Sequence, residues 1–163
     1  AEQLTELYQT LGLGALKFYL LRVDPKKKMI FDPKESIDLH GFTATFIQYT
    51  HARICSLLER TEYVKNEIVI HTEELLPAEK ALLMAIEQYP SVLLQAASEL
   101  NPSALCNYNF KLAQTFNSFF EQCSIARAEN EGKKILRQVI AAETAQVLSH
   151  SMNLLGIKVP NRM

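Results

Sequence analysis

The sequence predicts an all-α fold, a helical bundle, on three observations. Apolar residues recur at spacings of three and four along several stretches, most clearly over residues 43–60, 101–123 and 132–155. Alternating apolar and polar runs, which would indicate strands, are nearly absent. The 163 residues are 48% hydrophobic and 21% charged, which is typical of one globular domain with a real core.

Charge, hydropathy and cysteine content argue against a nonspecific nucleic-acid binder, a membrane protein and a disulfide-bonded secreted protein. The net charge is −1 and the isoelectric point about 6.5, so there is no overall basic field for nonspecific binding of nucleic acid. No stretch has the pattern of a signal peptide or a membrane span, and we expect a cytoplasmic protein with no membrane partner. Cys55, Cys106 and Cys123 are scattered and odd in number, which predicts free thiols in a reducing compartment.

The first forty residues predict helix followed by a connector. We expect two helical pieces over residues 1–23, divided by Gly12 and Gly14 because glycine weakens a helix. The chain begins inside a helical pattern without Met, which suggests a piece of a longer protein. Two Asp-Pro pairs mark residues 24–42 as a connector, with one helical turn over 34–39.

Residues 43–60 predict an amphipathic helix with an unusual flank. Its buried face consists of Ile47, Thr50, His51, Ile54, Leu57 and Leu58. A second stripe, with steps of three, four and seven, carries Phe46, Tyr49, Arg53 and Arg60. Aromatic rings can stack on bases, and arginine can stack or pair with phosphate. The stripe therefore indicates either a solvated helix edge or an RNA-binding site.

Further helices are predicted along the rest of the chain. We expect a loop over 61–74 with a strand-like patch at 68–70, then helices over 77–88 and 92–100 separated by a break at 89–91. In the long helix of 101–123, Asn109 and Asn117 are expected to hydrogen-bond neighbouring helices. A loop over 124–131 precedes the last helix, and Gly156 fits the position of positive φ that ends it.

No catalytic or metal-binding constellation is visible. His51 and Cys55 are spaced i, i+4, but two ligands do not make a structural zinc site, and we expect a hydrogen-bonded core histidine. Motifs for phosphate loops, dinucleotide binding, serine hydrolases and zinc peptidases are absent. The sequence therefore predicts no catalytic residue, no metal ligand and no cofactor site.

Four stretches together resemble one family. They are GLGALKFYLLRVDPKKKMIFDP (12–33), FIQYTHARI (46–54), NYNFKLAQTFNSFFEQC (107–123) and the terminal LLGIKVPNRM (154–163). In this order they resemble the C-terminal part of arginyl-tRNA synthetases, whose all-helical anticodon-binding domain is called the DALR domain. The element that names the domain reads Gly-Ala-Leu-Lys here, Phe46 replaces a more usual Tyr, and Thr50 replaces a more usual Ala.

The resemblance implies a helical bundle of the class Ia synthetase anticodon-binding type. Residues 1–40 would be the junction leaving the catalytic domain, and 41–163 the bundle. The two catalytic signatures of the family are absent, so the chain would lack aminoacylation activity alone, and ATP and Mg²⁺ would belong to the parent enzyme.

The resemblance also implies partners and site residues. The chain would bind the anticodon arm of tRNA(Arg) and pack against the catalytic domain of its own chain, as a monomer. The tRNA-binding residues would be Tyr49, Arg53 and Met163, with Phe46 nearby. Tyr49 would stack on a splayed base, and Arg53 would pair with a base edge or phosphate. The alternative is a helical scaffold for protein interaction whose Tyr/Arg stripe is a domain interface.

Overall fold

The computed structural model describes residues 2–39, 41–63 and 74–163. Within them the chain forms helices α1 (Glu2–Leu21), α2 (Pro33–Ser36), α3 (Ala44–Arg60), α4 (Pro77–Glu87), α5 (Tyr89–Ser98), α6 (Ser103–Gln122) and α7 (Glu131–Leu154). This confirms the predicted all-α class. The strand-like patch expected at 68–70 lies outside the described residues.

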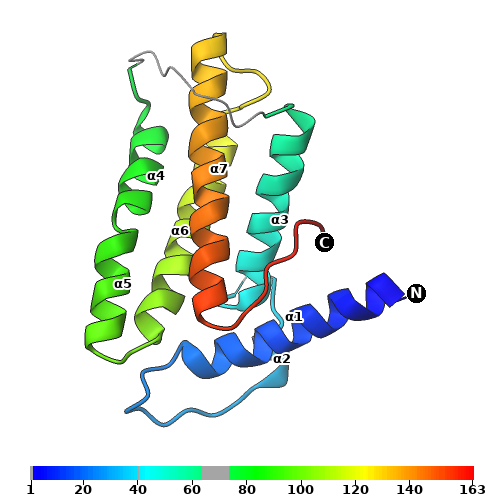
Figure 1. Cartoon of the computed structure of the whole chain (residues 1–163), viewed down its shortest axis with the longest axis vertical. Helices are drawn as coiled ribbons and strands as arrows, with labels where there is room; N and C mark the ends of the chain where they lie inside the picture. Colours follow the sequence, from blue (N-terminus) through cyan, green and yellow to red (C-terminus); the bar gives the residue numbers. More distant parts are fainter. Residues whose placement is uncertain (1, 40, 64–73) are drawn as a thin grey trace.

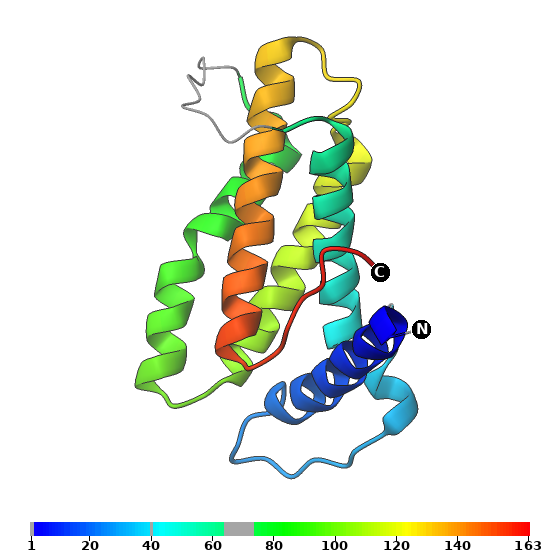
Figure 2. The same cartoon turned by 45° about the vertical axis from the view of Figure 1, so that its right-hand side comes forward.

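The long helices pack side by side, and α1 lies across one end of them. Figures 1 and 2 show α3, α6, α7 and the successive α4 and α5 running alongside one another, with α1 at the lower end of the view. Helix α6 packs against α3, α4, α5 and α7, and α3 packs against α7 and α1. The fully buried side chains that join these helices include Phe18, Ile47, Leu82, Leu112, Phe116, Ile140 and Leu148.

Helix α1 is continuous, so the prediction of two pieces was wrong. Gly14 faces α3, and a Cβ atom there would lie 2.7 Å from Gln48 Nε2 and 3.2 Å from Ile157 Cγ2. A Cβ on Gly12 would meet no atom within 4 Å. Tertiary packing of α1 on α3 therefore outweighs the local cost of two glycines, about 1 kcal/mol each.

Two other boundaries differ from the prediction because of residues at the helix starts. The short turn is α2 rather than 34–39, since Asp32 Oδ1 accepts from the backbone N–H groups of Lys34 (2.8 Å) and Glu35 (3.2 Å). The break expected at 89–91 is confined to Gln88. Helix α5 already begins at Tyr89, because Pro90 fits the first turn of a helix.

Helix α7 begins and ends within one residue of the predicted bounds. Asn130 caps its start by accepting from the N–H of Lys133 over 2.7 Å. Gly156 has φ +70°, and Ile157 N donates to Met152 O over 2.9 Å, as expected for a left-handed helix end.

The two asparagines of α6 behave differently. Asn117 hydrogen-bonds α3, as predicted: its Oδ1 accepts from Arg53 Nη1 over 3.1 Å and its Nδ2 donates to Thr50 Oγ1 over 3.4 Å. Asn109 is fully buried, and neither of its amide atoms has a hydrogen-bond partner among the described residues. The expected tie between helices at Asn109 was therefore wrong.

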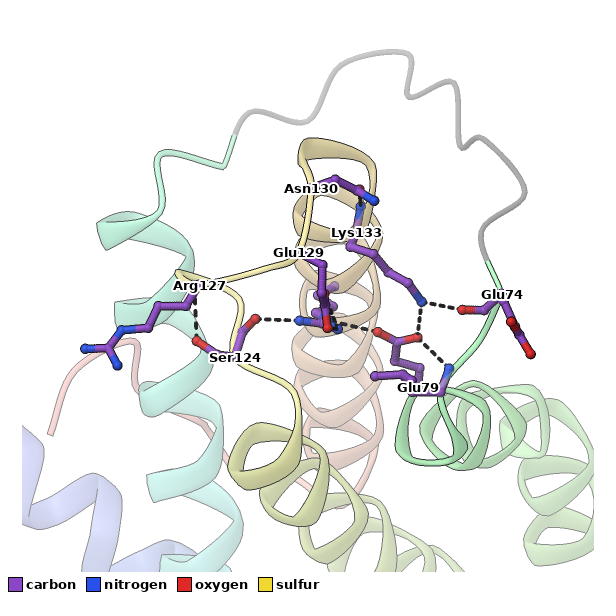
Figure 3. A network of polar contacts seen from close by, with 9 residues as sticks. Glu74, Glu79, Ser124, Arg127, Glu129, Asn130 and Lys133 are labelled. Atoms are coloured by element: carbon purple, nitrogen blue, oxygen red, sulfur yellow. Dashed lines mark hydrogen bonds and ion pairs between the residues drawn. The ribbon is translucent and has the colours of Figure 1, made fainter.

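A buried ionic network fixes the other end of the bundle (Figure 3). The carboxylate of Glu79, fully buried, accepts from Lys133 Nζ and from Arg137 Nε, each over 2.7 Å. Arg137 also donates to Ser124 O over 2.7 Å and pairs with Glu129. The network joins α4, α7 and the connection between α6 and α7, so it is a structural element of the fold.

No helix in the described ranges has both the length and the apolar character needed to cross a membrane. Nor do three or more His, Cys, Asp or Glu side chains cluster there as metal ligands would.

Candidate nucleic-acid interface

Tyr49 and Arg53 form a stacked pair on the exposed flank of α3. Their spacing of four residues places them one turn apart, and the Arg53 Cζ atom lies 4.9 Å from the centroid of the Tyr49 ring. Arg53 Nη2 also donates to the Tyr49 hydroxyl over 3.4 Å. Tyr49 is 44% exposed, so one ring surface remains open to a ligand. The helical spacing in the sequence therefore identified a real pair.

Helix α6 supports the guanidinium group of Arg53 from the other side. Arg53 Cζ lies 5.4 Å from the centroid of the Phe120 ring, within the range of a cation–π contact. Asn117 accepts a hydrogen bond from Arg53 Nη1, and its own amide donates to Thr50. Because both ends of the Asn117 amide are bonded, its oxygen has a fixed direction toward Arg53.

A cavity of about 320 Å³ lies beside the pair. It is lined by Tyr49, Ala52, Arg53, Ser56, Leu57, Arg60, Phe120 and Met163. Of the described side chains that line it, those of Arg53 and Arg60 carry a positive charge and none carries a negative one. A chain with net charge −1 thus has a local basic and aromatic surface, which is the combination that binds stacked bases and phosphates.

The C-terminal tail brings Met163 to this cavity. After Gly156 the chain turns back and runs beside α3, as Figures 1 and 2 show. Gln48 Nε2 donates to Lys158 O over 2.8 Å, and the His51 ring bonds Pro160 O through Nδ1 over 3.0 Å. His51 is thus the hydrogen-bonded core histidine that was predicted, and burial lowers its pKa.

Phe46 does not line the cavity that contains Met163, although it lies close to Tyr49 and Arg53. Its ring packs against Phe110, with the centroids 5.1 Å apart, and it is partly buried. It lines a second cavity of about 340 Å³, together with Leu39, Tyr49, Arg53, Asn117 and Glu121. The structure therefore brings Tyr49, Arg53 and Met163 around one cavity, and it places Phe46 in a second cavity that Tyr49 and Arg53 also line.

Sequence reasoning missed three contributors to the site. Phe120 was not among the predicted site residues, although it is 36% exposed and lines the cavity. Asn117 was interpreted only as a tie between helices. Gln48 was not singled out, although it is fully buried and bonds the tail. A polar residue beside the apolar face of an amphipathic helix is the signal that would have found it.

Comparison with solved structures shows which class of protein has this fold. The helix order and packing are those of the all-helical anticodon-binding part of a synthetase. The structure of Thermus thermophilus arginyl-tRNA synthetase superposes with a TM-score of 0.87 at 27% identity, over 94% of this chain and 27% of that one. That of arginyl-tRNA synthetase from Plasmodium falciparum gives 0.82 at 22% identity, over 97% and 28%, and shows the shared fold.

The chain belongs to the DALR anticodon binding domain family, whose model matches residues 47–163. It is 43% identical to an arginine–tRNA ligase of Flavobacterium psychrophilum over 99% of its own length. It is 42% identical to one from Phocaeicola vulgatus, also over 99%. The chain spans 27% of the length of each of these relatives.

Proposed function

We propose that this chain recognises the anticodon arm of tRNA(Arg) as part of an arginine–tRNA ligase. The observation that carries the proposal is that Met163, 110 residues after Arg53 in the sequence, lines one cavity with Tyr49 and Arg53. Family membership supports the class of ligand, and the similarity to arginine–tRNA ligases supports the choice of tRNA.

Each side chain of the cavity has a role that its chemistry supports. The open surface of the Tyr49 ring receives an unstacked anticodon base, and Met163 packs against the same nucleotide. Arg53 is directed by Asn117 and pairs with a base edge or a phosphate oxygen. Arg60 adds a second positive charge on the wall of the cavity for the RNA backbone.

The remaining activity of the parent protein belongs outside this chain. We infer that arginine activation with ATP and Mg²⁺ takes place in the part of the relatives that this chain does not span. Residues 1–40 then form the junction toward a catalytic domain, and 41–163 the bundle that binds RNA. The family resemblance further implies a cytoplasmic, monomeric enzyme.

The test is the affinity of the full-length protein for tRNA(Arg) in Tyr49→Ala and Arg53→Ala variants. Loss of a base-stacking aromatic costs about 1–3 kcal/mol, so Kd should rise about 5- to 150-fold in Tyr49→Ala. Tyr49→Phe, which keeps the ring, should bind nearly as well as the wild type. If Arg53 contacts a phosphate, the slope of log Kd against log salt concentration should be smaller by about 1 in Arg53→Ala, because one phosphate contact is lost.

Tyr8→Ala is the matched control, since Tyr8 is 64% exposed on α1 and does not line the cavity. Wild-type affinity in a folded Tyr49→Ala protein would refute the proposal. It would favour the alternative in which the Tyr49–Arg53 flank is a domain interface, and that alternative predicts weaker docking within the full-length protein instead.

A further inference from the structure

The tail that ends in Met163 contacts α3 at four successive levels. Gln48 and His51 bond the main-chain oxygens of Lys158 and Pro160. Farther along α3 the Cys55 thiol lies 3.7 Å from Asn161 Oδ1, and Glu59 pairs with Arg162 over 2.6 Å. The contacts follow the same order in both segments, so the tail runs parallel to α3.

The geometry of the two segments matches this register. The four residues of α3 are spaced by three, four and four, so they lie on one face of the helix and span about 16 Å. The tail from Lys158 to Arg162 spans about 13 Å when extended, and the side chains bridge the difference. This face of α3 adjoins the flank that carries Tyr49 and Arg53, and the tail leads to the cavity.

The first two contacts differ from the last one in burial. Gln48 is fully buried and His51 is 5% exposed, whereas Glu59 and Arg162 are exposed and form a weak surface pair. The tail contact is the one hydrogen bond that the Gln48 amide makes among the described residues, since its Oε1 atom has no partner there. Because a buried amide needs a hydrogen-bond partner and this one bonds a main-chain oxygen of the tail, Gln48 fixes the position of the tail on α3.

We propose that Gln48 and His51 are positioning residues of the RNA site: they hold the tail main chain on α3 and thereby keep Met163 on the wall of the cavity. This rests on the proposed function as far as RNA is concerned. The contact of the tail with α3 does not depend on the proposed function, and it can be measured without RNA.

Cys55 provides a built-in reporter of tail seating. It is half-buried beside Asn161 and His51, and burial raises the pKa of its thiol, so alkylation is slow while the tail is seated. Release of the tail exposes the thiol and increases the thiolate fraction. In the full-length protein, the rate of iodoacetamide labelling at Cys55 is followed by peptide mass spectrometry, with Cys106 and Cys123 as buried internal references.

The expected result is faster Cys55 labelling, by threefold or more, in Gln48→Leu and in His51→Leu. His51→Asn, which keeps an N–H group near the position of Nδ1, should restore most of the slow rate. Gln138→Leu is the matched control, because the Gln138 amide is also buried and donates to a main-chain oxygen, that of Thr61, but away from the tail. Unchanged Cys55 labelling in both leucine variants would overturn the proposal.

A double-mutant cycle connects the tail to RNA affinity. Met163→Ala and Gln48→Leu should each weaken tRNA(Arg) binding, and the double variant should bind within about twofold of Met163→Ala, because both changes remove the same contact. Independent losses that multiply would overturn the positioning role. If Tyr49→Ala binds like the wild type while Gln48→Leu still releases Cys55, then the proposed function fails and the tail contact stands as structural.

Discussion

Arg53 donates a hydrogen bond to Asn117 Oδ1 over 3.1 Å, and this contact connects the two helices that form the cavity. Asn117 is itself held by its bond to Thr50 Oγ1. Asn117 thus directs the guanidinium group of Arg53, although Asn117 itself does not line the cavity that contains Met163. An arginine fixed before RNA arrives loses less side-chain freedom on binding.

Replacing Asn117 should therefore weaken RNA binding through Arg53. Ordering one long side chain on binding costs about 0.5–1.5 kcal/mol, so Kd for tRNA(Arg) should rise about 2- to 12-fold in Asn117→Ala. Asn107→Ala is the control, because the Asn107 amide donates to Ser103 O within its own helix, α6. The measurement is a binding titration at fixed salt. Equal affinities of the two variants would show that Arg53 needs no support from α6.

The network around Glu79 should dominate the stability of the bundle at the end away from α1. In Glu79→Gln, Lys133 and Arg137 stay buried with one negative charge fewer, and removal of one partner from a buried pair costs about 3–5 kcal/mol. Glu131→Gln breaks the exposed pair with Lys134 and should cost about 0.5 kcal/mol or less. Urea unfolding of both variants measures the difference, and equal midpoints would contradict the structural role of Glu79.

The same network should make stability depend on acid pH. Burial acts to raise the pKa of Glu79, but hydrogen bonds from Lys133 and Arg137 outweigh burial and hold the pKa below its ordinary value of 4.5. Below pH 4.5 the unfolded chain therefore binds more protons at this residue than the folded chain does. The stabilisation is complete above that pH and is lost as the pH falls through the folded-state pKa.

The comparison of Glu79→Gln with the wild type isolates this contribution from that of other carboxylates. At pH 7 the free energies of unfolding should differ most. Toward pH 3 the difference should narrow, because a protonated Glu79 resembles glutamine. Urea titrations at several pH values between 3 and 7 provide the curve. A difference that does not change with pH would mean that Glu79 keeps its proton state on unfolding.

Local patterns predicted the elements of this fold and part of its site. The bounds of α3 and the neighbouring positions of Tyr49 and Arg53 follow from helical periodicity and from spacing along one helix. Gly156 was predicted because a helix end needs positive φ. Each of these depends on residues close in sequence, where the geometry of the helix is sufficient.

The features that sequence patterns did not predict all depend on contacts between distant residues. The partner of His51 is a main-chain oxygen of Pro160, and a carbonyl group leaves no mark in the sequence. Glu79 has the position of an ordinary residue in the first turn of a helix, and its burial follows only from how α7 packs on α4. The continuity of α1 depends likewise on its packing against α3.

Gly12 and Gly14 offer a direct test of that packing, because they share one helix and differ only in what faces them. Gly12→Ala adds a methyl group into open space, so the protein should become more stable by about 0.5–1 kcal/mol. Gly14→Ala gains the same helix propensity but places Cβ 2.7 Å from Gln48 Nε2. The buried amide must move, and its bond to Lys158 O is then lost.

Gly14→Ala should consequently be less stable than Gly12→Ala, and it should release the tail. Thermal unfolding compares the two proteins, and Cys55 labelling measures the tail in each. We expect a lower melting temperature and faster labelling in Gly14→Ala, with wild-type labelling in Gly12→Ala. If both substitutions stabilise the protein equally and leave Cys55 protected, then Gln48 accommodates a Cβ without moving the tail, and the close approach of α1 to α3 is not what requires glycine at position 14.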